Sequence, residues 1–373
     1  MNIGTPSRSR GQWFGRLINR IESARPSDRL ILRSLFFAAV GCFVWGIFLY
    51  NQAFVVSTPV PGGTVVEGVV GIPRFVNPVL AVTRADQDMS ALLFSGLMKI
   101  NTEGILIPDL AESITRSDDG KTYNIIMRRD NLFHDGTPLT ARDVAFTIGL
   151  IQNPDLKSPL RGNWAGVTVE EISEYELNIV LDEAYTPFIE NFTVGIIPRH
   201  IWSELPLEQI PFSQRNTEPV GSGPFSLEKV VRNDAGLIEV YELERAESDV
   251  KLEALTIRFY QNEDDLTKAF SEGKLTSTTN LRAADIATLV DSNVYNIVEK
   301  PLPRVFALFF NQNKSVALRD AAVREALDLA IDRNALVDTV LSGYGVPTDT
   351  PLPPTNTDNT LKYRKIDVVA ETT

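Results

Sequence analysis

Residues 133–144 read FHDGTPLTARDV, and residues 221–225 read GSGPF. The first stretch predicts a tight turn at Asp135-Gly136 that leads into a helix, because Thr140 is a favoured helix N-cap residue and Asp143 occupies the reciprocal position of a capping box. The second stretch predicts a sharp backbone corner, since glycine and proline both favour turns. Neither stretch carries a catalytic constellation, so we interpret both as parts of the framework of a fold.

Short predicted elements surround these motifs on both sides. Strands are predicted where apolar residues alternate or run together, at residues 64–70, 123–127, 177–181 and 255–259. Helices are predicted where apolar residues recur at helical spacing, from residue 141 onward, over 264–271, over 323–331 and then up to 341. We expect Asp332 to close the third helix and Gly343 to stop the fourth. This mixture, without a repeat or a regular βα alternation, indicates an α/β fold.

The charge of the chain is divided unequally along its length. The net charge is −12. Residues 1–33 carry seven arginines against one glutamate and one aspartate, which gives +5, so the remaining residues carry −17. A basic head, an apolar run and an acidic body in this order predict a cytoplasmic N-terminus and a body outside the membrane. The acidic body also argues against nucleic acid as a partner, because its surface would repel phosphates.

The apolar run, residues 34–50 (SLFFAAVGCFVWGIFLY), contains no charged residue. A helix that continued to residue 56 would exceed the hydrocarbon core of a bilayer, about 30 Å thick, so we predict one membrane span. A retained anchor is favoured, and two alternatives stay open. Cys42, the only cysteine, follows Ala-Val-Gly and weakly resembles a lipoprotein cleavage box. Residues 57–59 (STP) do not exclude cleavage of a signal peptide.

The chain lacks the usual signatures of catalysis and metal binding. His134 and His200 are the only histidines, and neither has the spacing of zinc ligands. We therefore expect no metal site and no cofactor, and interpret His134 as a turn residue whose imidazole bonds to the backbone. There is no nucleophile elbow and no phosphate-binding loop. The 48 acidic residues are interpreted as a solvated surface, so an enzyme is not expected.

The order of these motifs resembles the family 5 extracellular solute-binding proteins, the receptors that deliver oligopeptides, nickel and related solutes to ABC importers. The segments that carry the resemblance are, in chain order, 62–66 (GGTVV), 74–78 (RFVNP), 96–98 (GLM), 108–113 (PDLAES), 117–123 (SDDGKTY), 133–144, 197–202 (IPRHIW), 219–225 (PVGSGPF), 310–311 (FN), 323–327 (VREAL) and 331–333 (IDR). Each segment alone is short, and it is their order that points to the family.

The resemblance implies a two-lobed α/β fold of the periplasmic-binding-protein type II kind that closes on a ligand held between the lobes. In peptide-binding members an extended peptide is held largely through its backbone. Carried over to this sequence, the ligand-binding residues would be Val76, Asn77, Pro78, Asp88, Phe94, Phe309, Phe310 and Asn311, with Asp86 as a further candidate. Structural roles stay open as alternatives to ligand binding: Phe309 and Phe310 could pack in a hydrophobic core, and Asp88 could be an acid of the surface.

The expected organisation has four parts. They are a basic cytoplasmic head (1–33), a transmembrane anchor with the start of a stalk (34–58), a first α/β lobe (59–279) and a partial second lobe (280–373). The chain is shorter than is usual for the family, and residues 367–371 (DVVAE) read as a helix start. We therefore expect a C-terminal truncation that leaves the second lobe incomplete.

The function that the resemblance implies is a membrane-anchored extracytoplasmic receptor for a solute, most simply a peptide. Such a receptor hands its ligand to the permease subunits of an ABC-type importer, and its body lies in the periplasm or at the cell surface. The alternative is a surface sensor or scaffold protein that reuses the solute-binding fold, since a fold does not by itself fix a function.

Overall fold

The computed structural model describes residues 25–54, 62–279, 281–282, 285–286, 297–298 and 305–348 of the 373-residue chain. The chain divides into two compact units, Met1–Val60 and Pro61–Thr373. Most of the expected basic head, most of the expected stalk and the expected helix start at 367–371 lie outside the described residues.

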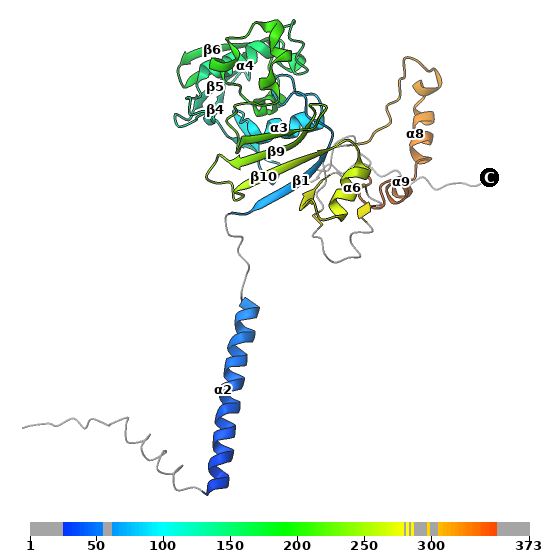
Figure 1. Cartoon of the computed structure of the whole chain (residues 1–373). Helices are drawn as coiled ribbons and strands as arrows, with labels where there is room; N and C mark the ends of the chain where they lie inside the picture. Colours follow the sequence, from blue (N-terminus) through cyan, green and yellow to red (C-terminus); the bar gives the residue numbers. More distant parts are fainter. Residues whose placement is uncertain are drawn as a thin grey trace, which may run out of the picture. The chain divides into compact units, whose positions relative to one another are not determined.

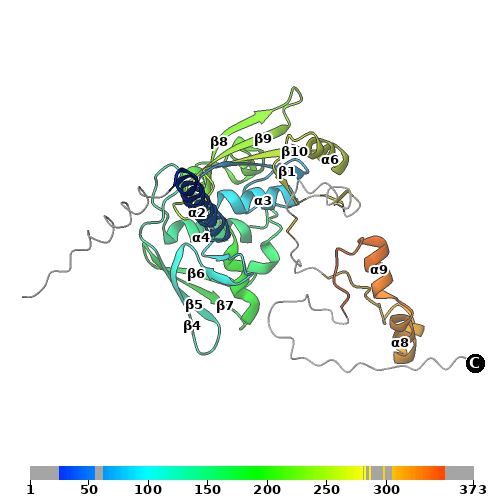
Figure 2. The same ribbon diagram turned by 90° about the horizontal axis from the view of Figure 1, so that it is seen from below.

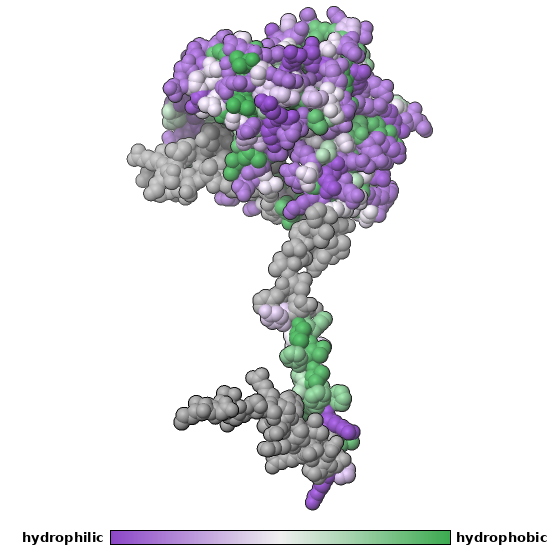
Figure 3. All heavy atoms as spheres, turned by 90° about the vertical axis from the view of Figure 1, so that its left-hand side faces the viewer, coloured by the Kyte–Doolittle hydropathy of each residue, from purple (hydrophilic) through white to green (hydrophobic). Residues whose placement is uncertain are grey.

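The first unit contains the helix α2, Pro26–Phe54. It begins eight residues before the apolar run, with a proline at its first position, where the missing N–H of proline leaves no helical bond unmade. Its described side chains are exposed, and in Figure 3 most of its spheres are green. Within the described part of the chain it is the one helix long and apolar enough to cross a membrane, judged by length and composition alone.

The main body, residues 62–279, is built on two principal sheets (Figures 1 and 2). The larger sheet has the strand order β11-β1-β10-β9-β8. Its strands are β1 (Thr64–Val70), β8 (Phe225–Arg232), β9 (Ile238–Arg245), β10 (Ala254–Tyr260) and β11 (Ser277–Thr278). β1 runs parallel to β10 and β11, whereas β8, β9 and β10 pair antiparallel. The first strand of the body therefore pairs with strands formed near the end of the body.

Alternation along β1 supplies both faces of this sheet, because successive strand residues point to opposite sides. Val65 and Val69 contact the main core of the body. Val66 and Val70 contact a smaller cluster formed by the helix α6 (Glu263–Ser271) and the residue Leu275. β1 is thus covered on both faces, which explains why valines occur on both of its faces, on either side of Glu67 and Gly68.

The second sheet is antiparallel, with the order β4-β5-β7-β6. Its strands are β4 (Ala111–Arg116), β5 (Thr122–Met127), β6 (Val167–Ser173) and β7 (Glu176–Leu181). The helix α4 (Ala141–Gln152) packs against β6. Its N-terminus has the expected capping box, in which the Asp143 carboxylate accepts from the Thr140 backbone N–H at 2.9 Å. The other oxygen of Asp143 accepts from the Arg199 N–H at 2.9 Å, so this buried acid also holds the start of the short helix α5, Arg199–Trp202.

Shorter elements connect and cover the sheets. They are α3 (Arg84–Leu93), the hairpin β2 (Met98–Ile100) and β3 (Leu106–Pro108), η1 (Arg161–Trp164), η2 (Thr186–Thr193), α5 (Arg199–Trp202), η3 (Leu207–Phe212) and η4 (Gln214–Asn216). An aromatic group packs within the core, with three edge-to-face contacts at ring-centroid distances of 5.3–5.5 Å and one tilted contact at 6.0 Å; its members are Tyr123, Trp164, Phe188 and Phe192. The α/β class expected from the sequence is confirmed.

Residues 305–348 contain η5 (Ala317–Arg319), α8 (Ala321–Leu329) and α9 (Arg333–Val340). None of these three elements buries a residue. The expectation that Asp332 closes the helix before it was wrong: α8 ends earlier, and Asp332 is the N-cap of α9, where its carboxylate accepts from the Ala335 N–H at 2.9 Å. An aspartate side chain is short enough to accept from the free N–H groups of the helix that follows it.

Candidate ligand-binding site

The segment after β1, residues 71–80, contains three of the predicted ligand-binding residues and is held by side chains from elsewhere in the body. Asp86, in the first turn of α3, is buried. One carboxylate oxygen accepts from the backbone N–H groups of Arg74 (2.6 Å) and Phe75 (2.9 Å), and the other accepts from the Thr83 N–H (3.1 Å). This buried acid therefore both caps α3 and fixes the start of the segment.

Asn77 and Val76 continue this network inward, and neither is exposed. The Asn77 side chain donates to the Asn216 side chain at 3.2 Å and accepts from the Val79 N–H at 3.0 Å. The Val76 N–H donates to the Asn216 carbonyl at 2.7 Å. The side-chain bonds of Asn77 are thus made within the protein, and they set the course of the backbone around it.

Pro78 and Phe94 meet at Gly195. A Cβ added to Gly195 would lie 2.6 Å from Cβ of Phe94 and 3.0 Å from Cγ of Pro78, so only glycine fits between them. The next residue, Val79, accepts at its carbonyl from the buried Ser158 hydroxyl at 2.6 Å. The structure therefore brings four of the predicted residues, Val76 to Pro78 and Phe94, into one buried neighbourhood.

The two motifs that mark the sequence are bonded to each other. The His134 N–H donates to the Gly221 carbonyl at 2.8 Å, and the His134 imidazole bonds to the Gly223 carbonyl at 3.0 Å. The N–H groups of Ser222 and Gly223 both donate to the carbonyl of Leu93, the last residue of α3. The glycine-rich segment thus lies across the end of α3.

The glycines are required there because of this close approach. A Cβ on Gly221 would lie 1.7 Å from the Leu93 carbonyl oxygen, and one on Gly223 would lie 2.6 Å from the Phe94 nitrogen. The interpretation of both motifs as framework agrees with these contacts.

His134 also bonds to backbone as the sequence predicted. Burial lowers its pKa, while the Gly223 carbonyl and the Asp135 carboxylate oppose the shift. Its Nδ1 is buried without a hydrogen-bond partner among the residues described. The second histidine, His200, bonds through Nε2 to the Asp135 carboxylate at 2.8 Å. His134 therefore joins the turn to the glycine-rich segment, and His200 joins the turn to α5.

An acidic pair lies at the edge of the large sheet where β1 meets β11. Burial raises the pKa of Glu67, on β1; hydrogen bonds from the Ser277 hydroxyl and the Thr279 backbone oppose the shift, and the nearby Asp88 adds to it. Partial desolvation also raises the pKa of Asp88, on α3, against the influence of Arg84, whose Nε lies 3.6 Å from the carboxylate. The Asp88 side chain is still 47% exposed, so this residue lies at the surface, as the alternative expected. Glu67 was not predicted as a site residue, because the sequence of a strand does not show which distant residue a single acid in it will contact.

The three predicted residues from the later part of the chain lie in the segment 305–348. Phe309 is 86% exposed and Phe310 partly buried. Asn311 is exposed, and its side chain accepts from the N–H groups of Asn313 and Lys314, both at 3.1 Å, so it forms a turn. Phe309 is therefore not a core residue in this structure, although the sequence left that alternative open.

Sequence reasoning missed several residues that hold this neighbourhood together: Asn216, Ser158 and Gly195. Asp86 was named only as a possible ligand contact, although the spacing Thr83-x-x-Asp86 is a capping-box signal that could have shown its structural role. Among the described residues, no group of three or more His, Cys, Asp or Glu is placed to hold a metal ion.

Comparison with known proteins finds a family of bacterial solute-binding proteins and individual peptide-binding proteins. The model for bacterial extracellular solute-binding proteins, family 5 Middle, matches residues 106–368, more than half of the chain. The oligopeptide-binding protein AppA of Bacillus subtilis is 28% identical over 291 residues, which cover 77% of this chain and 53% of AppA. The di/tripeptide-binding protein 3 of Pseudomonas aeruginosa is 27% identical, covering 80% of this chain and 60% of that protein.

Solved structures of the same kind share the fold. The B. subtilis AppA structure, in complex with a nonapeptide, has a TM-score of 0.67 at 27% identity and covers 83% of this chain and 61% of that one. NikZ from Campylobacter jejuni, in complex with Ni(L-His), has a TM-score of 0.63 at 27% identity, covering 75% of this chain and 56% of that one. The chain spans 53–60% of the length of the two curated relatives compared above. It belongs to the bacterial extracellular solute-binding proteins of family 5.

Proposed function

We propose that this chain is an extracytoplasmic receptor that binds a solute, in the first instance a peptide, for an ABC-type importer. The observation that carries the proposal is the family match over residues 106–368, joined by relatives whose names describe oligopeptide, dipeptide and tripeptide binding. Since one related structure holds Ni(L-His), a metal chelate is the second ligand class to test as cargo.

The proposed ligand-binding residues are the eight named from the sequence: Val76, Asn77, Pro78, Asp88, Phe94, Phe309, Phe310 and Asn311. Val76 and Asn77 are fully buried and the Asn77 side chain bonds inside the protein, so we propose that these two residues shape the wall of the ligand site. Contact with the peptide backbone is how a receptor tolerates varied peptide side chains. The first lobe would comprise residues 59–279, and residues 280–373 would form part of the second.

The proposed mechanism is differential binding. A ligand that contacts both lobes only in the closed form shifts the population toward that form, and a permease would recognise it. We further propose that α2 anchors the receptor as a single membrane span. Anchoring would confine the receptor to the membrane of the permease and so raise its effective concentration there.

The receptor proposal is tested by small-angle X-ray scattering of the detergent-solubilised full chain with and without a mixed peptide pool. We expect the radius of gyration to decrease with peptide and to stay constant with an equal concentration of free glycine. A folded protein that neither compacts nor retains any peptide would contradict the receptor role and favour the sensor or scaffold alternative.

The anchor is tested separately, in cells that produce the chain with a C-terminal tag. We expect the protein to stay in the membrane pellet after alkaline carbonate extraction, with an intact mass that includes residues 34–50. A tagged product that lacks these residues would show a cleaved signal, and a lipid-modified Cys42 at its N-terminus would show a lipoprotein.

A further inference from the structure

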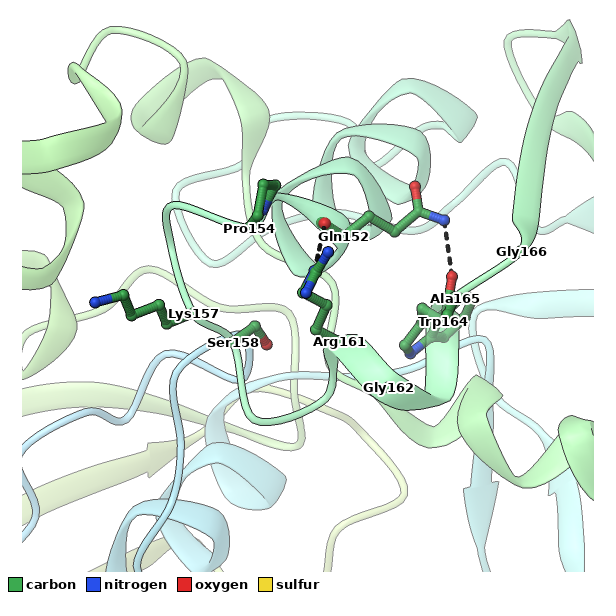
Figure 4. Close-up of a pocket in the computed structure, with 9 residues that line it drawn as sticks. All are labelled: Gln152, Pro154, Lys157, Ser158, Arg161, Gly162, Trp164, Ala165 and Gly166. Carbon is green, nitrogen blue, oxygen red and sulfur yellow. Dashed lines mark hydrogen bonds between the residues drawn. The ribbon is translucent and has the colours of Figure 1, made fainter.

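A hollow of about 640 Å³ lies in the main body where α4 ends and the chain passes through η1 (Figure 4). It is lined by residues of the stretch 152–166, among them Gln152, Lys157, Ser158 and Arg161. Its volume falls within the range of roughly 300–1,000 Å³ that is typical of small-molecule sites. None of its lining residues is among those proposed to bind the transported solute.

The charges around this hollow are segregated. Its lining includes two cationic side chains, Lys157 and Arg161, and no carboxylate. A neighbouring hollow of about 670 Å³ shares Gly162, Ala165 and Gly166 with it and has the opposite character, because its lining includes the acids Asp182, Glu183 and Glu190 and no lysine or arginine. The backbone from Gly162 to Gly166 thus separates a cationic hollow from an anionic one.

Both cationic side chains are exposed to solvent. In the stretches that the structure describes, neither Lys157 nor Arg161 forms an ion pair, whereas Arg232, Arg282 and Lys99 all do. Arg161 donates through Nε to the Gln152 carbonyl at 3.2 Å, which orients the guanidinium and leaves its two Nη groups for another acceptor.

Lys157 has a left-handed backbone (φ +54°), a conformation rare for a residue with a side chain. In Figure 4 Ser158 lies between the two residues, and the Lys157 side chain extends away from that of Arg161. The net charge of the chain is −12, so acidic partners are plentiful, yet these two cations in the same hollow form no ion pair among the described residues.

We propose that this hollow binds a small organic anion that bears a carboxylate or a phosphate group. The guanidinium of Arg161 presents two parallel N–H donors, a geometry that matches carboxylate and phosphate oxygens. The ammonium of Lys157 adds a second positive charge without a geometric requirement. The acids of the neighbouring hollow disfavour a large anion that extends past Gly162 to Gly166, so a compact ligand is expected.

The test is isothermal titration calorimetry of the detergent-solubilised full chain with succinate, inorganic phosphate and the neutral analogue succinamide. The variants are R161Q, K157Q and K157G, of which the last also relieves the left-handed backbone and so guards against misfolding. The control is R142Q, which removes a cation that is 70% exposed and lies at the other end of α4.

We expect at least one anion to bind saturably at one site, and succinamide not to bind. Each pocket variant should weaken the affinity about tenfold or more, because hydrogen bonds to charged groups are the stronger ones. R142Q should bind as the wild type does. The anion that binds more tightly then identifies the carboxylate or the phosphate class. Absence of saturable binding by both anions, or unchanged affinity in R161Q and K157G, would overturn the proposal.

Discussion

Asp86 is a single residue on which the segment 71–80 depends, because its buried carboxylate accepts from three backbone N–H groups. We predict that Asp86→Asn destabilises the protein by about 1–3 kcal/mol, since an amide would turn a donor toward those N–H groups and leave at least one unsatisfied. Urea unfolding followed by circular dichroism measures this. Asp88→Asn on the exposed side of the same helix is the control, and an equal loss in both variants would contradict the assigned role.

Gly221 and Gly149 form a matched pair of glycines in different surroundings. A Cβ on Gly221 would clash with the Leu93 carbonyl oxygen at 1.7 Å, whereas nothing lies within 4 Å of one on Gly149, an exposed residue of α4. Gly221→Ala should therefore lower the free energy of unfolding by more than about 3 kcal/mol. Gly149→Ala should raise it by about 0.5–1 kcal/mol. Thermal unfolding of both variants and of the wild type measures these changes. A Gly221→Ala protein as stable as the wild type would refute the packing described.

His134 makes the stability depend on pH in a defined direction. Its pKa in the folded protein is lowered, so the unfolded chain binds the proton more readily. Its contribution to stability is therefore complete above the ordinary value of about 6.5 and is lost as the pH falls from that value through the lower pKa of the folded state. Glu67 and Asp88 have raised pKa values and act in the opposite direction at lower pH.

Comparison with His134→Gln isolates this effect, because a glutamine amide can still donate to the Gly223 carbonyl but does not titrate. The free energy of unfolding of the wild type should decrease more steeply than that of His134→Gln as the pH falls from about 7 to about 5. Parallel pH profiles for the two proteins would be inconsistent with a buried neutral imidazole.

At the scale of elements, the helices of the segment 305–348 differ from those of the main body. α8 and α9 are nine and eight residues long and bury no residue, whereas α4 buries seven of its twelve. Helices shorter than about 12–15 residues are marginal in water without tertiary packing. We predict rapid amide hydrogen exchange in α8 and α9 and slow exchange in α4, measured by mass spectrometry on this chain. Comparable protection in the three helices would show that α8 and α9 are packed.

Local sequence signals predicted some of the elements, and β4, β6, β8, β9 and α3 were not among them. The strands β1, β5, β7 and β10 and the helices α4 and α6 lie where apolar patterning and caps placed them. Such signals depend on neighbours in the chain, and so they are readable from sequence. The pairing of β1 with β10 was not readable, because it joins strands from opposite ends of the main body and depends on packing rather than on local pattern.

The candidate site was less predictable than the fold for the same reason. The resemblance placed Val76, Asn77 and Pro78 in one segment, but the partner that holds Asn77 is Asn216, far along the chain. Nothing near either residue in the sequence indicates this bond. The charge pattern of the hollow at Lys157 and Arg161 could not be predicted from the sequence either, because the fold decides which acidic residues line the hollow and which do not.

At the scale of the whole molecule, the central claim is that the protein carries a solute. The most direct measurement is native mass spectrometry of the protein purified from the membranes of its own cells, followed by release and identification of any bound small molecule. We expect one solute per protein, a peptide or a metal chelate, that a peptide pool or the matching chelate displaces. A folded protein that arrives empty and takes up neither class would contradict it.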